Sequence, residues 1–330
     1  MKKFDCLVIG GSTEDLMFYT DESVIIKNPN AKDITRQKLI AFEYGAKIPS
    51  QAAYFTMGGG GQNVAVSLAK LGLKVSLLTA VGGDGVSQEI IQNLKINGVD
   101  QSLVKVYPKD RSSFSFIVNT GTFKEHVIFT YRGANYVMQI NLSDLKKIKT
   151  NWFYLTSLQG DYWKSNLQNI FKVVSANNIK ISWNPGGTQL ASGYKYLSRY
   201  LKQTEILHLN KDEAIELVLS YGKKVNNIEK LLLTIKAWGP QLVVITDGPN
   251  GAYAFDGKKI YYRRAPNTKG INTTGAGDSF CSAFVWGIIK YNDIRLALQA
   301  GIINSNSVIT EIGAQNGLLT SKQIKKELKL

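Results

Sequence analysis

Residues 272–280 combine small side chains with one carboxylate in a pattern suited to phosphoryl transfer. The segment reads Asn272-Thr273-Thr274-Gly275-Ala276-Gly277-Asp278-Ser279-Phe280, and the apolar residues that follow predict a buried helix. The small side chains of Gly275, Ala276 and Gly277 let an anion approach their N–H groups at the positive end of that helix. Asp278 can then accept the proton of an attacking hydroxyl group, although a simple helix cap is the alternative role for this residue.

A second glycine-rich segment begins another predicted helix. It reads Gly58-Gly59-Gly60-Gly61-Gln62-Asn63-Val64, with further apolar residues at Leu68 and Leu71. Glycine lets the backbone approach a ligand closely, and Asn63 can both donate to and accept from sugar hydroxyls. The segment is not a P-loop, because no Gly-Lys-Ser/Thr follows, nor a dinucleotide fingerprint, which would follow the first strand. A flexible hinge is the alternative interpretation.

Short apolar runs separated by helical patterns predict the scaffold for these segments. The predicted strands are Cys6–Ile9, Val75–Ala80, Trp152–Leu155, Lys180–Trp183, Ile206–Leu209 and Leu242–Thr246. A crossover helix is predicted between Trp163 and Ala176. Alternating strands and helices predict a mostly parallel sheet with helices on both faces, in an α/β fold. No repeat or linker divides residues 1–330, which favours a single domain.

Two stretches interrupt this alternation, at about 15–57 and 111–132. They contain the β-rich pieces Val24–Lys27, Ala52–Thr56, Ser113–Asn119 and His126–Tyr131, the last two forming a predicted hairpin around Asn119-Thr120-Gly121. We expect them to form a small β-strand lid over the strand ends, with ordinary surface excursions as the alternative. The edges of such a lid can pair in a homodimer or be blunted, and the sequence leaves both open.

Composition excludes several classes of protein. The 330 residues contain only two cysteines, Cys6 and Cys281, and two histidines, His126 and His208, so zinc clusters and disulfide frameworks are not expected. Buried free thiols favour a cytoplasmic protein, and the start of the chain is too short and interrupted for a secretory signal. No apolar run approaches the ~18 residues of a membrane span. The net charge of +15 lacks a basic block, so we expect an anionic small substrate rather than nucleic acid.

Taken together, the two glycine-rich segments resemble the two signatures of the ribokinase-like (PfkB) carbohydrate kinase family. Five shorter segments are similar to family motifs in the same order: Ile9-Gly10-Gly11-Ser12-Thr13-Glu14-Asp15, Asn184-Pro185-Gly186, Asn210-Lys211-Asp212-Glu213, Thr246-Asp247-Gly248-Pro249-Asn250-Gly251 and Gly313-Ala314. The resemblance covers nearly the whole chain. It implies a ribokinase-like fold and an ATP-dependent kinase that phosphorylates a hydroxyl of a sugar or nucleoside, with a pentose such as ribose or an adenosine-like nucleoside favoured.

The resemblance also implies roles for individual residues. Asp15, as the last residue of the first strand motif, would hold substrate hydroxyls together with Gly59, Gly60 and Asn63. Nucleotide contacts would come from Asn184, Asn210, Thr246, Gly248, Gly251 and Gly313. Glu213 would position magnesium, which accompanies ATP, through bound water. From position alone, Arg132 and Gln159 are further substrate-binding candidates, with a surface arginine and ordinary loop polarity as the alternatives.

One departure from the family pattern concerns a cation. The second signature usually opens with Asp, whereas this chain has Asn272. In potassium-activated members that carboxylate helps to surround a monovalent cation, together with Thr274 and the C-terminal loop. Because an amide carries no charge, we expect weakened cation affinity, which argues against dependence on potassium without deciding it.

Two other functions compete with the kinase. A non-catalytic sugar or nucleotide sensor would keep the pocket without transfer, but the intact Asp278 and Glu213 argue against it. An NAD-dependent dehydrogenase would need the glycine fingerprint after the first strand, and Ile9-Gly10-Gly11-Ser12 lacks it.

Overall fold

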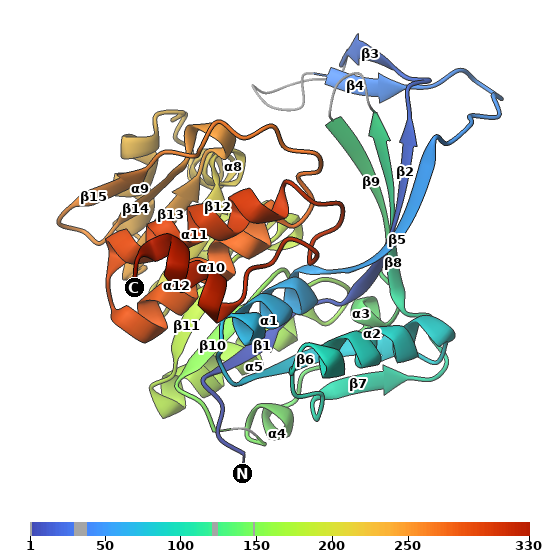
Figure 1. Ribbon diagram of the computed structural model, residues 1–330. Coiled ribbons are helices and arrows are strands. Elements are labelled where there is room, and N and C mark those ends of the chain that lie inside the picture. The colour runs from blue at the N-terminus through green and yellow to red at the C-terminus, as the bar shows by residue number, and fades with distance from the viewer. Residues whose placement is uncertain (1, 30–37, 121–124, 148) are drawn as a thin grey trace.

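The computed structural model describes residues 2–29, 38–120, 125–147 and 149–330 (Figure 1). Within these residues, nine strands form one large sheet. In spatial order they are β15 (Ile260–Arg263), β14 (Ala252–Phe255), β13 (Leu242–Thr246), β12 (Ile206–Asn210), β11 (Lys180–Trp183), β10 (Trp152–Leu155), β1 (Cys6–Ile9), β6 (Val75–Gly82) and β7 (Val104–Tyr107). All neighbours pair in parallel except β14, which is antiparallel to both β13 and β15.

The six strands predicted from apolar runs are the contiguous centre of this sheet, from β13 to β6. They are mostly apolar because both of their faces are covered. β7 and β15, which the sequence analysis did not predict, lie at the two edges and are only partly buried. Edge strands need fewer apolar residues, so their sequence signal is weaker.

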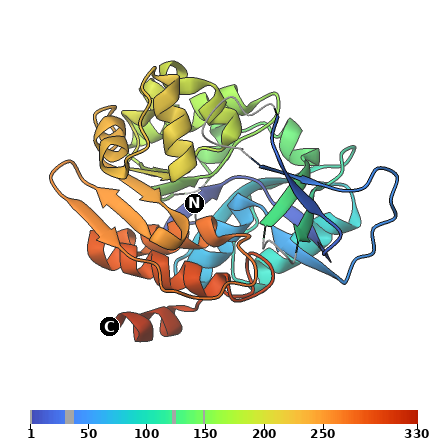
Figure 2. The same cartoon turned by 90° about the horizontal axis from the view of Figure 1, so that it is seen from above.

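Helices cover the sheet on both sides and enclose two separate cores. Leu7 and Ile9 of β1 face one core, whereas the alternating residues Cys6 and Val8 face the other. The helices of the first core are α3 (Gly133–Val137), α4 (Leu142–Leu145), α5 (Trp163–Asn177), α6 (Gly187–Ala191), α7 (Gly193–Leu201), α8 (Lys211–Ser220) and α9 (Ile228–Lys236). The helices of the second are α1 (Gly60–Lys70), α2 (Gly85–Ile96), α10 (Ala276–Tyr291), α11 (Ile294–Val308) and α12 (Ser321–Leu328). Figure 2 shows the yellow-green and the blue and red helices on opposite sides.

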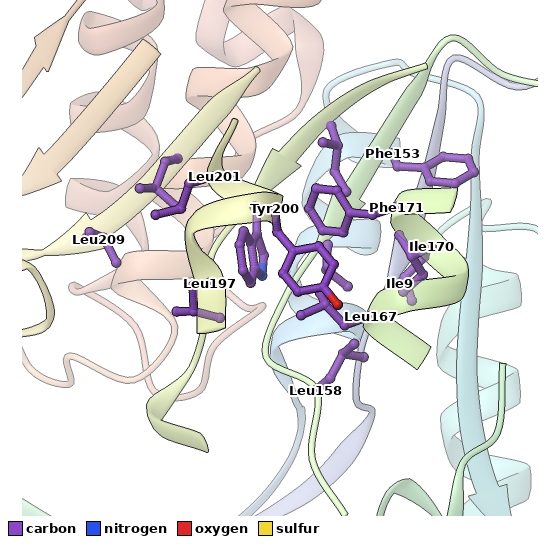
Figure 3. Close-up of a cluster of buried hydrophobic side chains, with 14 of the residues drawn as sticks. Ile9, Phe153, Leu158, Leu167, Ile170, Phe171, Leu197, Tyr200, Leu201 and Leu209 are labelled. Carbon is purple, nitrogen blue, oxygen red and sulfur yellow. The ribbon is translucent and has the colours of Figure 1, made fainter. Parts of the chain in front are cut away.

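The first core is dominated by aromatic and branched side chains (Figure 3). Phe171 of α5 and Tyr200 of α7 lie side by side there, with ring centroids 4.9 Å apart. In the second core α1 packs against α10, so the two helices that begin with glycine-rich segments are neighbours. Both cysteines are free and buried, as predicted.

A smaller sheet rises from the main body as the lid (Figure 1). Its strands, in spatial order, are β5 (Ala52–Gly58), β2 (Thr13–Thr20), β8 (Ser113–Thr120) and β9 (Glu125–Tyr131), and a hairpin of β3 (Val24–Lys27) and β4 (Lys38–Ala41) lies at its far end. The predicted hairpin is present as β8 and β9, although Gly121 of its turn lies outside the described residues. The lid begins at Thr13, slightly earlier than the predicted boundary at 15.

Within the described part of the chain, no helix is both long enough and apolar enough to cross a membrane.

Candidate active site

The carboxyl ends of the central strands bring several polar residues to one edge of the large sheet. Thr156 follows β10, Asn184 follows β11, Asn210 ends β12 and Thr246 ends β13. Asn210 and Thr246 are aligned partners across the last two strands. In parallel α/β sheets this edge is where ligands bind, and the two glycine-rich segments reach the same edge.

Asp278 lies in the first turn of α10, directly after the glycine turn. Gly275, the N-cap residue, has φ of +78°, and a Cβ atom there would lie 2.5 Å from the Cβ atom of Ala314. Only glycine fits both the left-handed backbone and the close approach. The turn thereby directs the Asp278 carboxylate toward α1, where its Oδ2 atom accepts a hydrogen bond of 2.9 Å from Nδ2 of Asn63.

The glycine run before α1 lies against this carboxylate. A Cβ atom on Gly60 would lie 3.5 Å from Oδ1 of Asp278 and 3.4 Å from Cβ of Thr156. Gly59 has φ of +89°, and a Cβ atom there would lie 2.6 Å from the Gly11 carbonyl oxygen. The run is therefore a tightly packed turn rather than a flexible hinge, and it joins β1, β10 and α10.

Asp15 is buried beside the same turn. It lies on β2 of the lid, not at the end of β1, because β1 ends at Ile9 and the chain enters the lid sheet at Thr13. Its carboxylate lies against the backbone of Gly58, and its Oδ1 atom accepts a hydrogen bond of 3.1 Å from Thr13. Burial, opposed by hydrogen bonds from Ser115 and Thr13, raises the pKa of Asp15, and the charge of Asp278 adds to the increase.

Burial likewise raises the pKa of Asp278, and the hydrogen bond from Asn63 opposes part of that effect. Asn63 is only 5% exposed, and its Oδ1 atom accepts a hydrogen bond of 3.0 Å from Nε2 of Gln315. The oxygen and the nitrogen of the Asn63 side-chain amide, which we expected to bind substrate, are thus both hydrogen-bonded to protein partners. One N–H of its amide group is left to meet a substrate hydroxyl.

The predicted anion-binding turn is only partly available. The Ala276 N–H donates to the carbonyl of Thr273 at 3.2 Å, so it closes the turn instead of facing a ligand. The N–H groups of Gly275 and Gly277 have no backbone acceptor within the described residues. Gly277 is exposed, and nothing lies within 4 Å of the position a Cβ atom would take. Gly275 and Gly277 are therefore the two candidate donors to an anion.

A cleft of about 1310 Å³ opens beside this turn. It is lined by Ala276 and Gly277 of the turn, by Asn210, Thr246, Gly248 and Gly251 of the predicted nucleotide site, and by Tyr19 and Asn119 of the lid. Asp278, Asp15 and Gly59 are not part of its lining. The structure thus brings together four of the six predicted nucleotide-binding residues with the anion-binding turn.

The other two nucleotide candidates lie outside this cleft. The Nδ2 atom of Asn184 donates to the carbonyl oxygen of His208 at 3.0 Å, which ties β11 to β12. Gly313 has φ of +93° and packs against Thr56 of β5. Both residues therefore hold backbone segments near the site, and neither lines the cleft.

Asn210 and Glu213 cap helix α8 for each other. The Oδ1 atom of Asn210 accepts from the Glu213 N–H at 2.9 Å, and the Asn210 N–H donates to Oε2 of Glu213 at 2.8 Å. This capping box is a structural explanation for the Asn-x-x-Glu pattern. Burial raises the pKa of Glu213 to about 7, the Asn210 hydrogen bond lowers it in part, and the charges of Glu216, Asp212 and Asp278 raise it further.

The two further substrate candidates, Arg132 and Gln159, lie in the segments that follow β9 and β10. Arg132 follows β9 and is half-buried, and its guanidinium has no ion-pair partner within the part of the chain that is described. Its burial lowers the pKa of the side chain. Gln159 lies in the loop after β10, where its Nε2 atom donates to Oγ of Ser157 at 3.4 Å.

Asn272 connects the start of the second signature to the lid. Its Oδ1 atom accepts from the Thr274 N–H at 2.9 Å, and its Nδ2 atom donates to the Tyr19 hydroxyl at 3.3 Å and to Oδ1 of Asn119 at 3.4 Å. An amide can make this pair of donor contacts, whereas a carboxylate cannot. The expected loss of a charged cation ligand is therefore accompanied by a polar contact with β2 and β8.

Sequence reasoning missed two residues of the site. Thr156 lies between Gly10 and Gly60, and Gln315 donates a hydrogen bond to the side chain of Asn63. Thr156 had a usable signal, because it follows the predicted strand Trp152–Leu155 directly. Gln315 follows the Gly313-Ala314 motif, but its contact with α1 spans 252 residues and had no local signal.

The large sheet is mostly parallel, the small lid sheet pairs its strands in both directions, and a carboxylate lies in the first turn of a helix that begins with glycine. These features define the ribokinase-like class of phosphotransferases. Residues 31–321 match the pfkB family carbohydrate kinase model, and the chain belongs to that family. It is therefore a carbohydrate kinase on a nucleotide-binding fold, and the dehydrogenase alternative is excluded.

Individual relatives agree in fold and differ in ligand. A ribokinase of Lactococcus lactis is 29% identical over 274 residues, covering 82% of this chain and 85% of the relative. The structure of Arabidopsis thaliana ribokinase complexed with ribose and ATP superposes with a TM-score of 0.80 at 19% identity, covering 100% of both chains. A Burkholderia thailandensis nucleoside kinase in complex with inosine gives 0.79 at 17% identity, covering 98% of this chain and 96% of that one.

Proposed function

We propose that this kinase transfers the γ-phosphate of ATP to a primary hydroxyl of a sugar or nucleoside. A pentose such as ribose, or an adenosine-like nucleoside, is the favoured acceptor. The observation that supports this most is the position of Asp278, which lies in the first turn of α10, beside the N–H groups of Gly275 and Gly277 and in contact with Asn63. A proton acceptor next to donors for an anion is what transfer to a hydroxyl requires.

Each group then has one task in the transfer. Asp278 accepts the proton of the acceptor hydroxyl, and its raised pKa makes it a better base as long as it stays ionised. The Gly275 and Gly277 N–H groups stabilise charge on the transferring phosphate. Gly275 packs closely against Ala314, so its donor needs little reorganisation when the charge develops.

The cleft beside the turn is the proposed ATP site. Asn210, Thr246, Gly248 and Gly251 line it, and its volume of about 1310 Å³ exceeds what a nucleotide needs. Asn184 and Gly313 support the site from outside it. The small residues at 248 and 251 allow the backbone to approach the nucleotide closely.

Magnesium fits the proposed site as a companion of the nucleotide. Within the described residues no group of three or more His, Cys, Asp or Glu could hold a metal alone. Mg²⁺ in kinases is bound by one or two carboxylates, phosphate oxygens and water, so a single nearby carboxylate suffices. Glu213 would take that role through water, since its Oε2 atom is already used by the Asn210 N–H. When bound, the ion neutralises phosphate charge.

The acceptor site is proposed to lie between the glycine turn and the lid. The buried carboxylate of Asp15 and the backbone of Gly59 and Gly60 would bind adjacent hydroxyls, with one Asn63 N–H as a further donor. Arg132 and Gln159 are outer candidates for the remaining substrate atoms. Closure of the lid would exclude water that otherwise competes for the phosphate.

A non-catalytic sensor is the second candidate, and one observation favours it. The capping box explains Asn210 and Glu213 without any role in catalysis. Release of ADP with purified protein, measured across a panel of pentoses, hexoses and nucleosides, separates the two. Turnover with any acceptor supports the kinase, and ligand-induced thermal stabilisation without ADP release across the whole panel supports the sensor.

The lid also suggests a homodimer. Phe55 of β5, Phe116 of β8 and Phe129 of β9 lie in one row across the same face of the lid sheet and are 66%, 36% and 57% exposed, which is unusual for large apolar side chains. We propose that two copies of the chain cover these residues with each other. Sedimentation analysis tests this: a dimer that Phe129→Ser converts to monomer supports it, and a monomer at all concentrations contradicts it.

A further inference from the structure

We propose that Gln315 is a positioning residue for the carboxylate of Asp278, acting through the side-chain amide of Asn63. The proposal rests on the catalytic role proposed for Asp278 and adds a residue that no sequence motif marked. It arises from a row of side-chain amides that runs from the surface of α2 to the start of α10.

The row consists of consecutive amide-to-amide hydrogen bonds. Asn93 of α2 donates from Nδ2 to Oε1 of Gln315 at 2.9 Å. Gln315 donates from Nε2 to Oδ1 of Asn63 at 3.0 Å, and Asn63 donates from Nδ2 to Oδ2 of Asp278 at 2.9 Å. Asn97, one turn after Asn93, donates to Oδ1 of Asn93 at 3.2 Å. We call Asn93, Gln315 and Asn63 the amide relay.

The direction of the relay is set by the carboxylate at its end. An ionised carboxylate only accepts, so Asn63 must turn its NH₂ group toward Asp278. Its oxygen then faces Gln315, which must present its own NH₂ group, and Asn93 must do the same in turn. Every amide therefore points its positive end toward Asp278, and aligned hydrogen bonds polarise one another.

Burial makes the arrangement difficult for water to replace. Asn63 is 5% exposed and Gln315 is 9% exposed. The backbone that carries Gln315 is fixed by Nζ of Lys70, which lies 3.5 Å from the carbonyl oxygens of Gln315 and Leu318. Without the Gln315 donor, the Oδ1 atom of Asn63 would lack its partner, and the amide could rotate to present oxygen to Asp278.

The relay matters because Asn63 supplies the side-chain hydrogen bond that favours the charge on Asp278, in addition to the positive end of α10. The ionisable groups that face it are Asp15 of β2, Glu213 of α8, Tyr154 of β10 and Cys281 of its own helix. All four are acids, so each is neutral or negative. Burial raises the pKa of Asp278, and the Asn63 hydrogen bond lowers it. Correct orientation of Asn63 thus keeps the base ionised.

The test replaces Gln315 by methionine, which has a similar shape but no donor. The matched control is Gln92→Met, the same exchange at an exposed position of α2 outside the relay. Melting temperatures show whether both variants fold, and Asn93→Leu, which removes only the outer partner, provides a second variant. The main readout is the apparent pKa of Asp278. It is measured by a ¹³C NMR titration of labelled aspartate carboxyls in the protein without substrate, and the Asp278 signal is assigned by its absence in Asp278→Asn.

We expect Gln315→Met to raise the apparent pKa of Asp278 by at least about half a unit, a fraction of the roughly one to two units that a hydrogen bond to a charged group is worth. Asn93→Leu should give a smaller shift in the same direction, and Gln92→Met none. In kinetic assays the acid limb of kcat/KM should move to higher pH by the same amount, with the KM for ATP unchanged. A Gln315→Met protein that folds and titrates like the parent overturns the proposal.

The relay and the catalytic role of Asp278 are tested separately by these variants. If Asp278→Asn abolishes turnover while Gln315→Met leaves both titration and turnover unchanged, the kinase assignment stands and the relay is wrong. If Gln315→Met shifts the titration while Asp278→Asn turns over normally, the hydrogen-bonded row exists but the catalytic role of Asp278, and with it the positioning role of Gln315, is refuted.

Discussion

The Nδ2 atom of Asn63 donates a hydrogen bond to Oδ2 of Asp278 at 2.9 Å, joining two residues that are 215 positions apart in the chain. The contact joins the first turn of α1 to the first turn of α10. It places the two glycine-rich segments side by side and fixes the position of the Asp278 carboxylate.

The Asp15 carboxylate should control affinity for the acceptor rather than for ATP. Asp15→Asn removes a charged hydrogen-bond acceptor, so the KM for the sugar or nucleoside should rise by about tenfold or more, with little change in the KM for ATP. Asp21→Asn, at the exposed residue directly after β2, is the control and should behave like the parent. Steady-state kinetics with each substrate varied in turn measure both values. An unchanged KM for the acceptor argues against Asp15 as a ligand.

Gly275 should be indispensable to the fold of the turn. Its φ of +78° and the close approach of Ala314 mean that Gly275→Ala should destabilise the protein by ~1–3 kcal/mol, through backbone strain and steric overlap. Gly85→Ala, at a helix start with open space around it, should change stability by less than ~0.5 kcal/mol. Urea unfolding compares the two. Equal stabilities would mean that the turn is not strained.

Local sequence predicts those parts of the structure that depend on complete burial or on unusual composition. The six central strands were predictable because complete burial produces unbroken apolar runs, such as the four residues of β1. Asp278 and the glycine turns were predictable because their composition is rare. The capping box of Asn210 and Glu213, the closing of the turn by the Ala276 N–H and the contact of Gln315 with Asn63 depend on three-dimensional packing. A single domain stays a prediction, which one cooperative unfolding transition would support.

The Glu213 carboxyl should make stability depend on pH. Its pKa is raised from 4.5 to about 7 in the folded protein, so the folded state binds the proton more tightly than the unfolded chain. The free energy of unfolding should therefore fall as pH rises from about 4.5 to about 7. Glu213→Gln keeps a residue that can cap α8 but does not titrate, so this decline should become smaller.

Chemical unfolding at several pH values across that range tests the Glu213 prediction. Glu229→Gln, at an exposed position in the first turn of α9, is the matched control and should retain the parent's decline. If Glu213→Gln and the parent lose stability in parallel, the proton is not bound at Glu213.

Because it has Asn272 where a carboxylate would bind the cation, the parent enzyme should not depend on potassium. Its amide carries no charge and donates to Tyr19 and Asn119 of the lid, so potassium chloride should stimulate turnover no more than choline chloride at the same ionic strength. Asn272→Asp restores a carboxylate and should make turnover respond to potassium. Initial rates in the two salts measure the effect. Strong potassium stimulation of the parent would show that the cation is bound without this charge.

Turnover of Asp278→Ala tests the central claim most directly. With saturating ATP and the best acceptor, we expect kcat to fall by at least ~10², because the proton of the attacking hydroxyl loses its acceptor. The melting temperature should stay close to that of the parent, because removing a buried carboxylate relieves its desolvation cost and thereby offsets the lost hydrogen bond from Asn63. A folded Asp278→Ala protein with near-normal kcat would contradict the proposed mechanism.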